Sequence, residues 1–171
     1  MLPRADLPGE GLTRVDFEQL RSLGAIALYA TTFVVALVSG LVPYVLSFEV
    51  FVLAVATLTN APIAPIVGLG VLGQAITKYI LYLAGTGTLN ISWVRRTATS
   101  RAAEAFARHP HASLGVVLSS AAFAVPPLYP TSVIAGTLRL PQIAFVLVVA
   151  AGSIVRYSAL FLAPKLIRPL F

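Results

Sequence analysis

The run from Ser22 to Val42 contains no charged side chain. A helix needs about 20 apolar residues to cross the hydrocarbon of a bilayer, and this run is just long enough. The rest of the chain is similar, because 58% of its 171 residues are hydrophobic and only 11% are charged. Soluble domains are typically about a quarter charged. We therefore predict an integral membrane protein built mostly of apolar helices.

Prolines and short lengths distinguish the later apolar segments. The stretch after Pro43 is too short for a comfortable crossing, and residues 114–138 are interrupted by three prolines, which remove helix hydrogen bonds. We read the latter stretch as two half-helices around a turn. We predict a cytoplasmic tail at 1–21, a membrane domain at 22–163 and a C-terminal tail at 164–171. The first half of the membrane domain consists of a transmembrane helix at 22–42, a re-entrant segment at 44–60 and a transmembrane helix at 62–84. A polar interfacial loop at 85–113, a re-entrant segment at 114–138 and a transmembrane helix at 141–163 follow.

Two halves of this domain share one order of features. Each runs from proline through a short apolar stretch and a turn to a longer helix, in which a basic residue precedes tyrosine, as Lys78-Tyr79 and Arg156-Tyr157. With one crossing between them, the halves would enter from opposite sides of the membrane, as in many transporters. The predicted fold class is an all-α integral membrane protein, an inverted repeat of re-entrant segment plus transmembrane helix, with an additional N-terminal transmembrane helix.

Three charged residues inside apolar segments are the main candidates for chemistry. Glu49 is the only acidic residue in such a segment, and a buried carboxylate must be paired, protonated or in contact with water. Lys78 and Arg156 lie in the long helices that follow the short segments. We expect a buried ionic cluster that binds phosphate or couples to protons. The alternatives are a structural ion pair, or cations that extend to the membrane surface.

The proline-rich turn is a second candidate. Pro126, Pro127 and Pro130 would free backbone carbonyls, and Tyr129 would add a phenol, inside a membrane cavity. These groups suit binding of a headgroup or an ion. The alternative is a tight turn that serves only the shape of the fold.

Glycines mark the third segment, at Gly68, Gly70 and Gly73. Such spacing lets another helix backbone approach closely. Neither a preceding strand nor a Walker-type lysine and serine accompanies them, so a phosphate-binding loop is not indicated. We predict that these glycines serve helix packing.

The net charge of +6 comes from basic residues between the apolar segments. This placement follows the positive-inside rule and puts residues 1–21 and 85–113 in the cytoplasm. Anionic lipid headgroups are therefore the expected partners, and nucleic acid is not.

The sequence lacks the residues that several kinds of chemistry require. The chain has no cysteine, and His109 and His111 have no nearby carboxylate cluster to complete a metal site. A Gly-x-Ser-x-Gly elbow is also missing. We expect no enzymatic activity, no metal and no cofactor.

The order of these parts, from about Pro43 to Tyr157, resembles the DedA family, also called the SNARE-associated or VTT-domain superfamily. In the first half, the matching residues are Pro43 and Glu49, which look like the proline and glutamate of the first re-entrant segment, then Gly70-Val-Leu-Gly73, Tyr79 and Gly85. Thr86 stands where the family has an arginine. The resemblance assigns turn or packing roles to Pro43, Gly70 and Gly73.

The second half carries the rest of the resemblance. Its matching residues are Phe123-Ala-Val-Pro126-Pro127, Ala135-Gly136, Arg139, Phe145, Gly152 and Arg156. Many members have an arginine just before this proline turn, where this chain has Phe123 and small residues. Pro126, Pro127 and Gly136 take structural roles in this comparison, and Arg139 joins Tyr129 as a second-rank binding candidate.

This resemblance implies transport of a phosphate-bearing lipid, as a flippase or scramblase in a prokaryotic inner membrane. Undecaprenyl phosphate and phospholipids are the substrates linked to the family. The residues also leave room for an ion- or proton-coupled small-solute transporter, for a scaffold that binds a partner through its glycine face and basic loop, and for a homo-oligomer.

Overall fold

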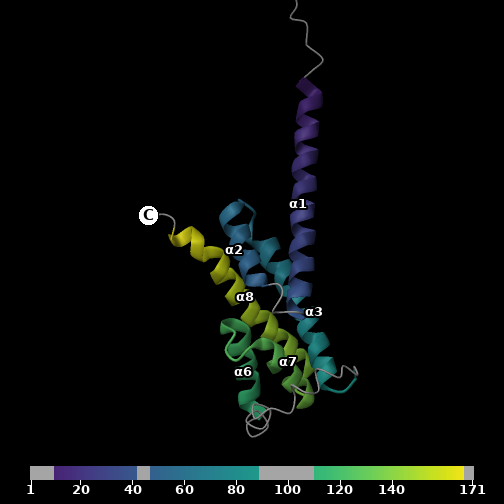
Figure 1. Ribbon diagram of the computed structural model, residues 1–171, viewed down its shortest axis with the longest axis vertical. Coiled ribbons are helices and arrows are strands. Elements are labelled where there is room, and N and C mark those ends of the chain that lie inside the picture. Colours follow the sequence, from purple (N-terminus) through teal and green to yellow (C-terminus); the bar gives the residue numbers. More distant parts are fainter. Residues whose placement is uncertain (1–9, 42–46, 89–109, 168–171) are drawn as a thin grey trace, which may run out of the picture.

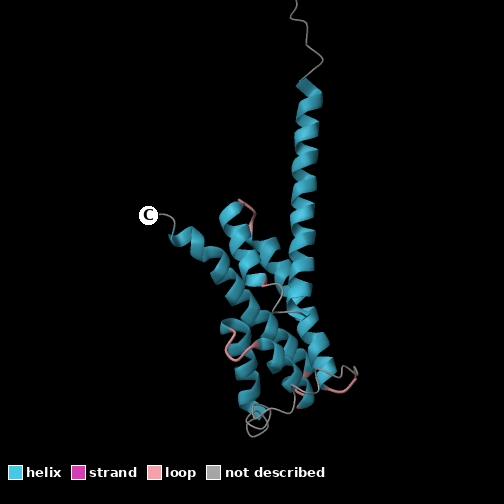
Figure 2. Cartoon of the chain, in the orientation of Figure 1, coloured by secondary structure: helices cyan, strands magenta, loops and turns pink. Residues whose placement is uncertain are grey.

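The computed structural model describes residues 10–41, 47–88 and 110–167, and these ranges contain helices and no strand (Figures 1 and 2). The helices are α1 (Glu10–Leu41), α2 (Phe48–Leu58), α3 (Ile63–Gly85), α6 (Pro110–Phe123), α7 (Leu128–Thr137) and α8 (Gln142–Ile167). The prediction of an all-α chain is confirmed.

Three helices are long and apolar enough to span a membrane. Their apolar spans are Ser22–Leu41 in α1, Ile63–Gly85 in α3 and Gln142–Leu166 in α8. These spans coincide with the three expected transmembrane helices to within a few residues. The break expected at the prolines is also present, because α6 ends at Phe123 and α7 begins at Leu128.

Helix boundaries differ from expectation at several places. The first helix begins at Glu10, within the expected tail, and its N-terminal part extends beyond the other helices in Figure 1. At the other end, α8 continues through Pro164. The expected polar loop already becomes helical at Pro110. Pro43, His109, most of that loop and the last four residues lie outside the described part of the chain.

Packing links each short helix to the long helix of the other half. In the first half α1 packs on α3, and in the second half α6 packs on α8. The short helix α2 instead packs on α8, and α7 packs on α3. The long helices α3 and α8 also contact each other, so they form the centre of the bundle (Figure 1).

Glycines allow several of these contacts. A Cβ added at Gly73 would meet Ala36 and the backbone of α1, and one added at Gly70 would meet the Phe48 ring of α2. The packing role predicted for these two residues fits this geometry. Gly68 differs, because no atom lies within 4 Å of its would-be Cβ. It sits on a helix face that no neighbour covers.

The closest approach between helices joins α3 to α7. A Cβ added at Gly136 would meet the carbonyl of Tyr82, and one added at Gly85 would meet the carbonyl of Val133. Neither glycine can carry a side chain without moving backbone. The pair therefore fixes how closely α7 lies against α3.

Two larger apolar clusters form most of the interior, and a third, smaller one lies between α3 and α7. The first larger cluster joins α1, α2, α3 and α8 around Phe48 and Tyr157, whose rings meet edge to face with centroids 4.9 Å apart. The second joins α3, α6, α7 and α8 and includes Leu128 and Tyr82. The Tyr82 hydroxyl donates to the carbonyl of Leu140 at 2.6 Å, so this phenol also secures the turn between α7 and α8.

Candidate functional site

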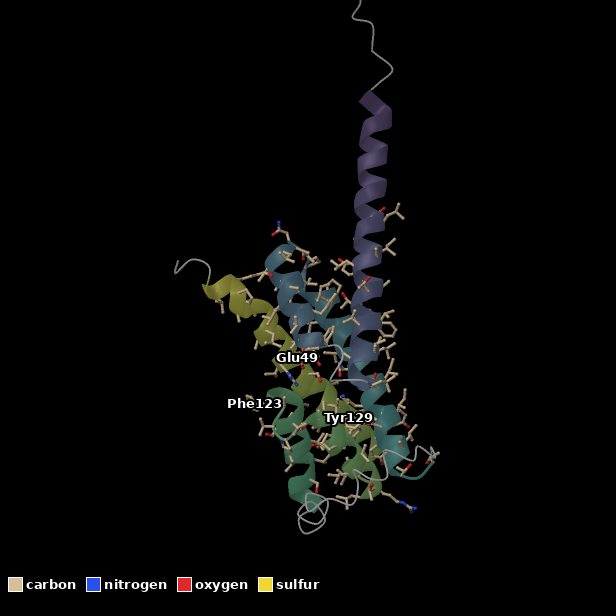
Figure 3. The ribbon with its side chains drawn as sticks, in the orientation of Figure 1. Glu49, Phe123 and Tyr129 are labelled. Carbon is tan, nitrogen blue, oxygen red and sulfur yellow. The ribbon has the colours of Figure 1, made fainter. Side chains whose placement is uncertain are left out.

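A cavity of about 420 Å³ lies where residues of the two larger apolar clusters meet. Its lining comes from five helices and the turn before α7: Ser39, Ser47, Phe48, Glu49, Gln74, Lys78, Ala124, Pro127, Leu128, Tyr129, Pro130, Arg156 and Tyr157. Figure 3 labels two lining residues, Glu49 of α2 and Tyr129 of α7, which come from the first and second halves of the chain. All three predicted charged candidates thus line one cavity.

Glu49 and Arg156 form an ion pair between α2 and α8. The Arg156 guanidinium lies 2.5 Å from Glu49 Oε1, and the Ser47 hydroxyl donates to the other carboxylate oxygen, also at 2.5 Å. Glu49 stands in the first turn of α2, where the helix dipole favours a negative charge. Both partners are partly exposed, with side-chain exposures of 31% for Glu49 and 21% for Arg156. They are accessible from the cavity.

Lys78 is more deeply buried, with 5% of its surface exposed. Its ammonium group donates to the backbone carbonyl of Gly40 at 3.2 Å and lies 6.0 Å from the centroid of the Tyr129 ring. It makes no ion pair with Glu49, although both line the cavity. The expected cluster is therefore an acid–arginine pair with a separate lysine.

Lys78 belongs to a set of α3 side chains that satisfy the end of α1. The last carbonyls of a helix lack partners within the helix, and inside a bundle they need other donors. Lys78 donates to the carbonyl of Gly40, which is one of the last four of α1. Gln74 and Thr77 donate to the carbonyls of Ala36 and Leu37, which lie one turn earlier in the same helix. The end of α1 therefore lies beside the middle of α3.

The opposite wall comes from the predicted proline turn. Pro127 and Pro130 line the cavity with Tyr129, whereas Pro126 does not. The Pro126 carbonyl instead accepts a 2.6 Å bond from Ser120, and the Val125 carbonyl accepts one from Ser119. Carbonyls freed by the prolines are thus partly taken up by serines of α6.

Arg139 lies outside the cavity. It follows α7 with a φ of 51° and is exposed. The amides of Arg139 and Leu140 donate to the carbonyls of Gly136 and Ala135, which is the hydrogen-bond pattern of a Schellman cap. This position ends a helix, and no described contact brings its guanidinium to the other candidates.

Several lining residues were missed by the sequence analysis, among them Gln74, Ser39 and Tyr157. Gln74 and Ser39 share a 2.9 Å hydrogen bond at the end of α1, and the buried Tyr157 borders the ion pair. The signal for Gln74 was available, because it precedes Lys78 by four residues and shares its helix face. Ser39 gave no comparable signal, since serines are common in apolar helices.

The charges of this cavity favour an anion. Its described lining holds two cations and one carboxylate, so the balance is positive when all three are ionised. An apolar bundle strengthens the attraction between such charges and a ligand. Within the described ranges no three histidine, aspartate or glutamate side chains gather in a way that would hold a metal ion.

Comparisons with protein-family models, curated proteins and solved structures found no match to this chain.

Proposed function

We propose that this chain is a transporter of phosphate-bearing lipids, a flippase or scramblase, in a prokaryotic inner membrane. The observation that carries the proposal is the cavity with Glu49, Lys78 and Arg156, which has an excess positive charge within an apolar bundle. Lysine and arginine are the usual partners of phosphate. Undecaprenyl phosphate and phospholipids both have this headgroup chemistry, and membership of the DedA family is part of the proposal.

An inverted repeat of two hairpins is the architecture that we propose for this transporter. One hairpin is α1 with α2 and the other is α6 with α7, and each is followed by a long helix. Five contacts between helices support the repeat: each first helix packs on its own long helix, each second helix packs on the other long helix, and the long helices contact each other. Lys78 and Arg156, the matching basic residues of α3 and α8, line one cavity.

The first hairpin modifies the expectation that residues 22–42 cross the membrane completely. Carbonyls in the last two turns of α1 are bound by Gln74 and Lys78, near the middle of α3. If α3 spans the bilayer, α1 ends at mid-depth and α2 returns to the side from which α1 entered. The apolar length of α1 allows a crossing, but the position of its end favours a re-entrant arm.

Transport would use the polar cavity for the headgroup and the surrounding lipid for the acyl chains. Phe123 and Val125, beside the cavity residue Ala124, are 74% and 69% exposed, which suits contact with lipid chains (Figure 3). Hairpin tips that meet at mid-depth would shorten the apolar barrier that a headgroup has to pass.

Lipid movement in sealed proteoliposomes tests this proposal. The assay compares a fluorescent phospholipid and a polyprenyl phosphate with wild-type protein and with the variants Glu49→Gln and Arg156→Ala. We expect movement by wild type and a loss of at least about tenfold in both variants, because each loses a charge that lines the cavity. Arg139→Gln is the matched control, since it removes a cation outside the cavity, and it should retain wild-type movement.

The same assay separates the rival functions. Uptake of a small anion without lipid movement would indicate a solute transporter and overturn the proposal. If neither lipid nor solute moves with folded protein, the scaffold is the better reading. Bulky substitutions at Gly70 or Gly73 should then abolish partner binding while Glu49→Gln has no effect.

Topology is tested separately by cysteine labelling, for which the absence of native cysteine provides a clean background. Single variants Ser22→Cys, Asn60→Cys and Thr88→Cys are exposed to a membrane-impermeant maleimide in oriented vesicles. In the hairpin arrangement Ser22→Cys and Asn60→Cys react from one side and Thr88→Cys from the other, which replaces the expectation that residues 1–21 and 85–113 share one side. Reaction of Ser22→Cys and Asn60→Cys from opposite sides would show that α1 crosses completely.

A further inference from the structure

The two cations of the cavity differ in what balances their charge. Arg156 is paired with the Glu49 carboxylate at 2.5 Å, whereas the only hydrogen-bond partner of Lys78 among the described residues is the carbonyl of Gly40. We propose that Lys78, and not Arg156, binds the phosphate group of the ligand. This inference rests on the proposed function and specifies which end of the cavity receives the headgroup.

Burial makes the charge on Lys78 costly unless an anion accompanies it. The side chain is 5% exposed, and a carbonyl dipole compensates an ammonium ion only in part. Glu49 attracts the ammonium group but forms no ion pair with it, so a bound phosphate would supply a counter-charge in direct contact. Lys78 therefore has more to gain from an anion than a cation that is already paired.

The ammonium group also has donors to offer. It carries three N–H bonds, and Gly40 accepts one of them. Two remain for phosphate oxygens without any change at the end of α1. The wall beside it is the Tyr129 ring, whose centroid lies 6.0 Å from Nζ, so an anion would approach along the face of the cavity that this ring borders.

The surroundings of Arg156 disfavour the same anion. A phosphate bound there would approach Glu49, whose carboxylate holds one negative charge against the guanidinium. Repulsion between like charges is strong inside an apolar bundle. Ser47 also donates to Glu49, which ties the carboxylate in place. The ion pair therefore fits a role in positioning α2 against α8, and Lys78 fits the role of the ligand-binding cation.

Calorimetric titration of the purified full chain in dodecyl maltoside tests this inference, because that detergent contains no phosphate. The probes are short-chain phosphatidic acid, inorganic phosphate and the uncharged short-chain diacylglycerol. Binding of phosphatidic acid alone identifies a lipid headgroup as the source of the anion. Equal binding of inorganic phosphate identifies free phosphate as a ligand of the same subsite.

Variants then locate the subsite. Lys78→Gln removes the charge but keeps an N–H donor for Gly40, and we expect about tenfold weaker binding or more, with thermal unfolding close to wild type. Lys78→Arg restores a cation and should recover most of the affinity. Lys165→Gln, which removes a lysine located at the exposed end of α8, is the matched control and should bind as wild type does.

Results that would contradict this inference differ from those that would contradict the proposed function. If folded Lys78→Gln binds like wild type while Arg156→Gln loses binding, the inference is overturned, and the proposed lipid transport stands. If wild type binds none of the phosphate probes, Lys78 is not a phosphate site. Lipid movement in proteoliposomes would still decide the proposed function independently.

Discussion

The last turn of α1 and the last turn of α6 both end beside the cavity, but donors for the nearby carbonyls come from different places. At the end of α1 the donors are Gln74, Thr77 and Lys78, which all belong to α3. At the end of α6 the donors are Ser119 and Ser120 of α6 itself. One hairpin depends on a neighbouring helix, and the other satisfies its own turn.

The two hairpins also differ in the charge that they bring to the cavity. The first hairpin places Glu49 in the cavity, whereas the segment from Phe123 to Pro130 contains no charged residue. The first hairpin is therefore held by polar contacts that a ligand or a proton can alter. The second is held by hydroxyl bonds within its turn and by close backbone contact with α3. We expect the first hairpin to respond to ligands and the second to act as a fixed wall.

The largest effect should come from the close contact of the second hairpin. Gly136→Ala would place a methyl group against the Tyr82 carbonyl, which cannot move without shifting α3. We expect a loss of about 3 kcal/mol in the free energy of unfolding, measured by denaturant titration in detergent. Gly70→Ala should cost less, because its methyl group meets the Phe48 ring, a side chain that can turn. Equal costs would contradict a stiffer second hairpin.

A somewhat smaller effect should come from the ion pair of the first hairpin. Arg156→Met leaves Glu49 without its cation, and we expect a cost of about 2 kcal/mol, below that of a fully buried pair because both side chains are partly exposed. The double variant Glu49→Gln with Arg156→Met should recover about half of this loss. Additive losses in a double-mutant cycle would show that the pair is not a unit.

Removing one hydroxyl donor should lower the free energy of unfolding by about 1 kcal/mol in either hairpin, but it should loosen a different part of the chain in each. Thr77→Val removes the donor to Leu37, so hydrogen exchange should increase at the end of α1. Thr131→Val removes the donor to Pro127, so exchange should increase within its own hairpin. If both variants loosened the same helix, the contrast between donors from a neighbouring helix and donors from the same hairpin would be wrong.

The smallest effect on stability and transport should be found at Arg139, which lies outside the cavity. Its φ of 51° suits glycine, so Arg139→Gly should leave stability unchanged or raise it by up to about 1 kcal/mol. Lipid movement should remain at the wild-type level. A transport defect in this folded variant would show that the second hairpin also contributes charge to the site.

Local sequence properties were enough for the helices and for the break between α6 and α7. Length and the absence of charge identify apolar spans such as Ser22–Leu41, and consecutive prolines interrupt a helix wherever they occur. Helix ends were less predictable, because Glu10 and Pro110 begin helices within stretches that read as polar.

Contacts between distant residues could not be predicted in the same way. A charge in an apolar segment identifies Glu49, Lys78 and Arg156 as candidates, but it does not say which cation faces the acid. The structure pairs Glu49 with Arg156 because α2 packs on α8. Lys78 instead faces a carbonyl 38 residues earlier in the chain. Neither the spacing nor the composition of the sequence indicates these two partners.

The dependence of α1 on α3 has a consequence for how the protein is made. While α1 is the only helix in the membrane, the carbonyl of Gly40, one of the last four of this helix, lacks the donor that Lys78 of α3 later provides. Its C-terminal end is then best kept near water or within the insertion machinery. Stable integration of the first helix therefore waits for the synthesis of the third, and the first three helices should enter the bilayer as one unit.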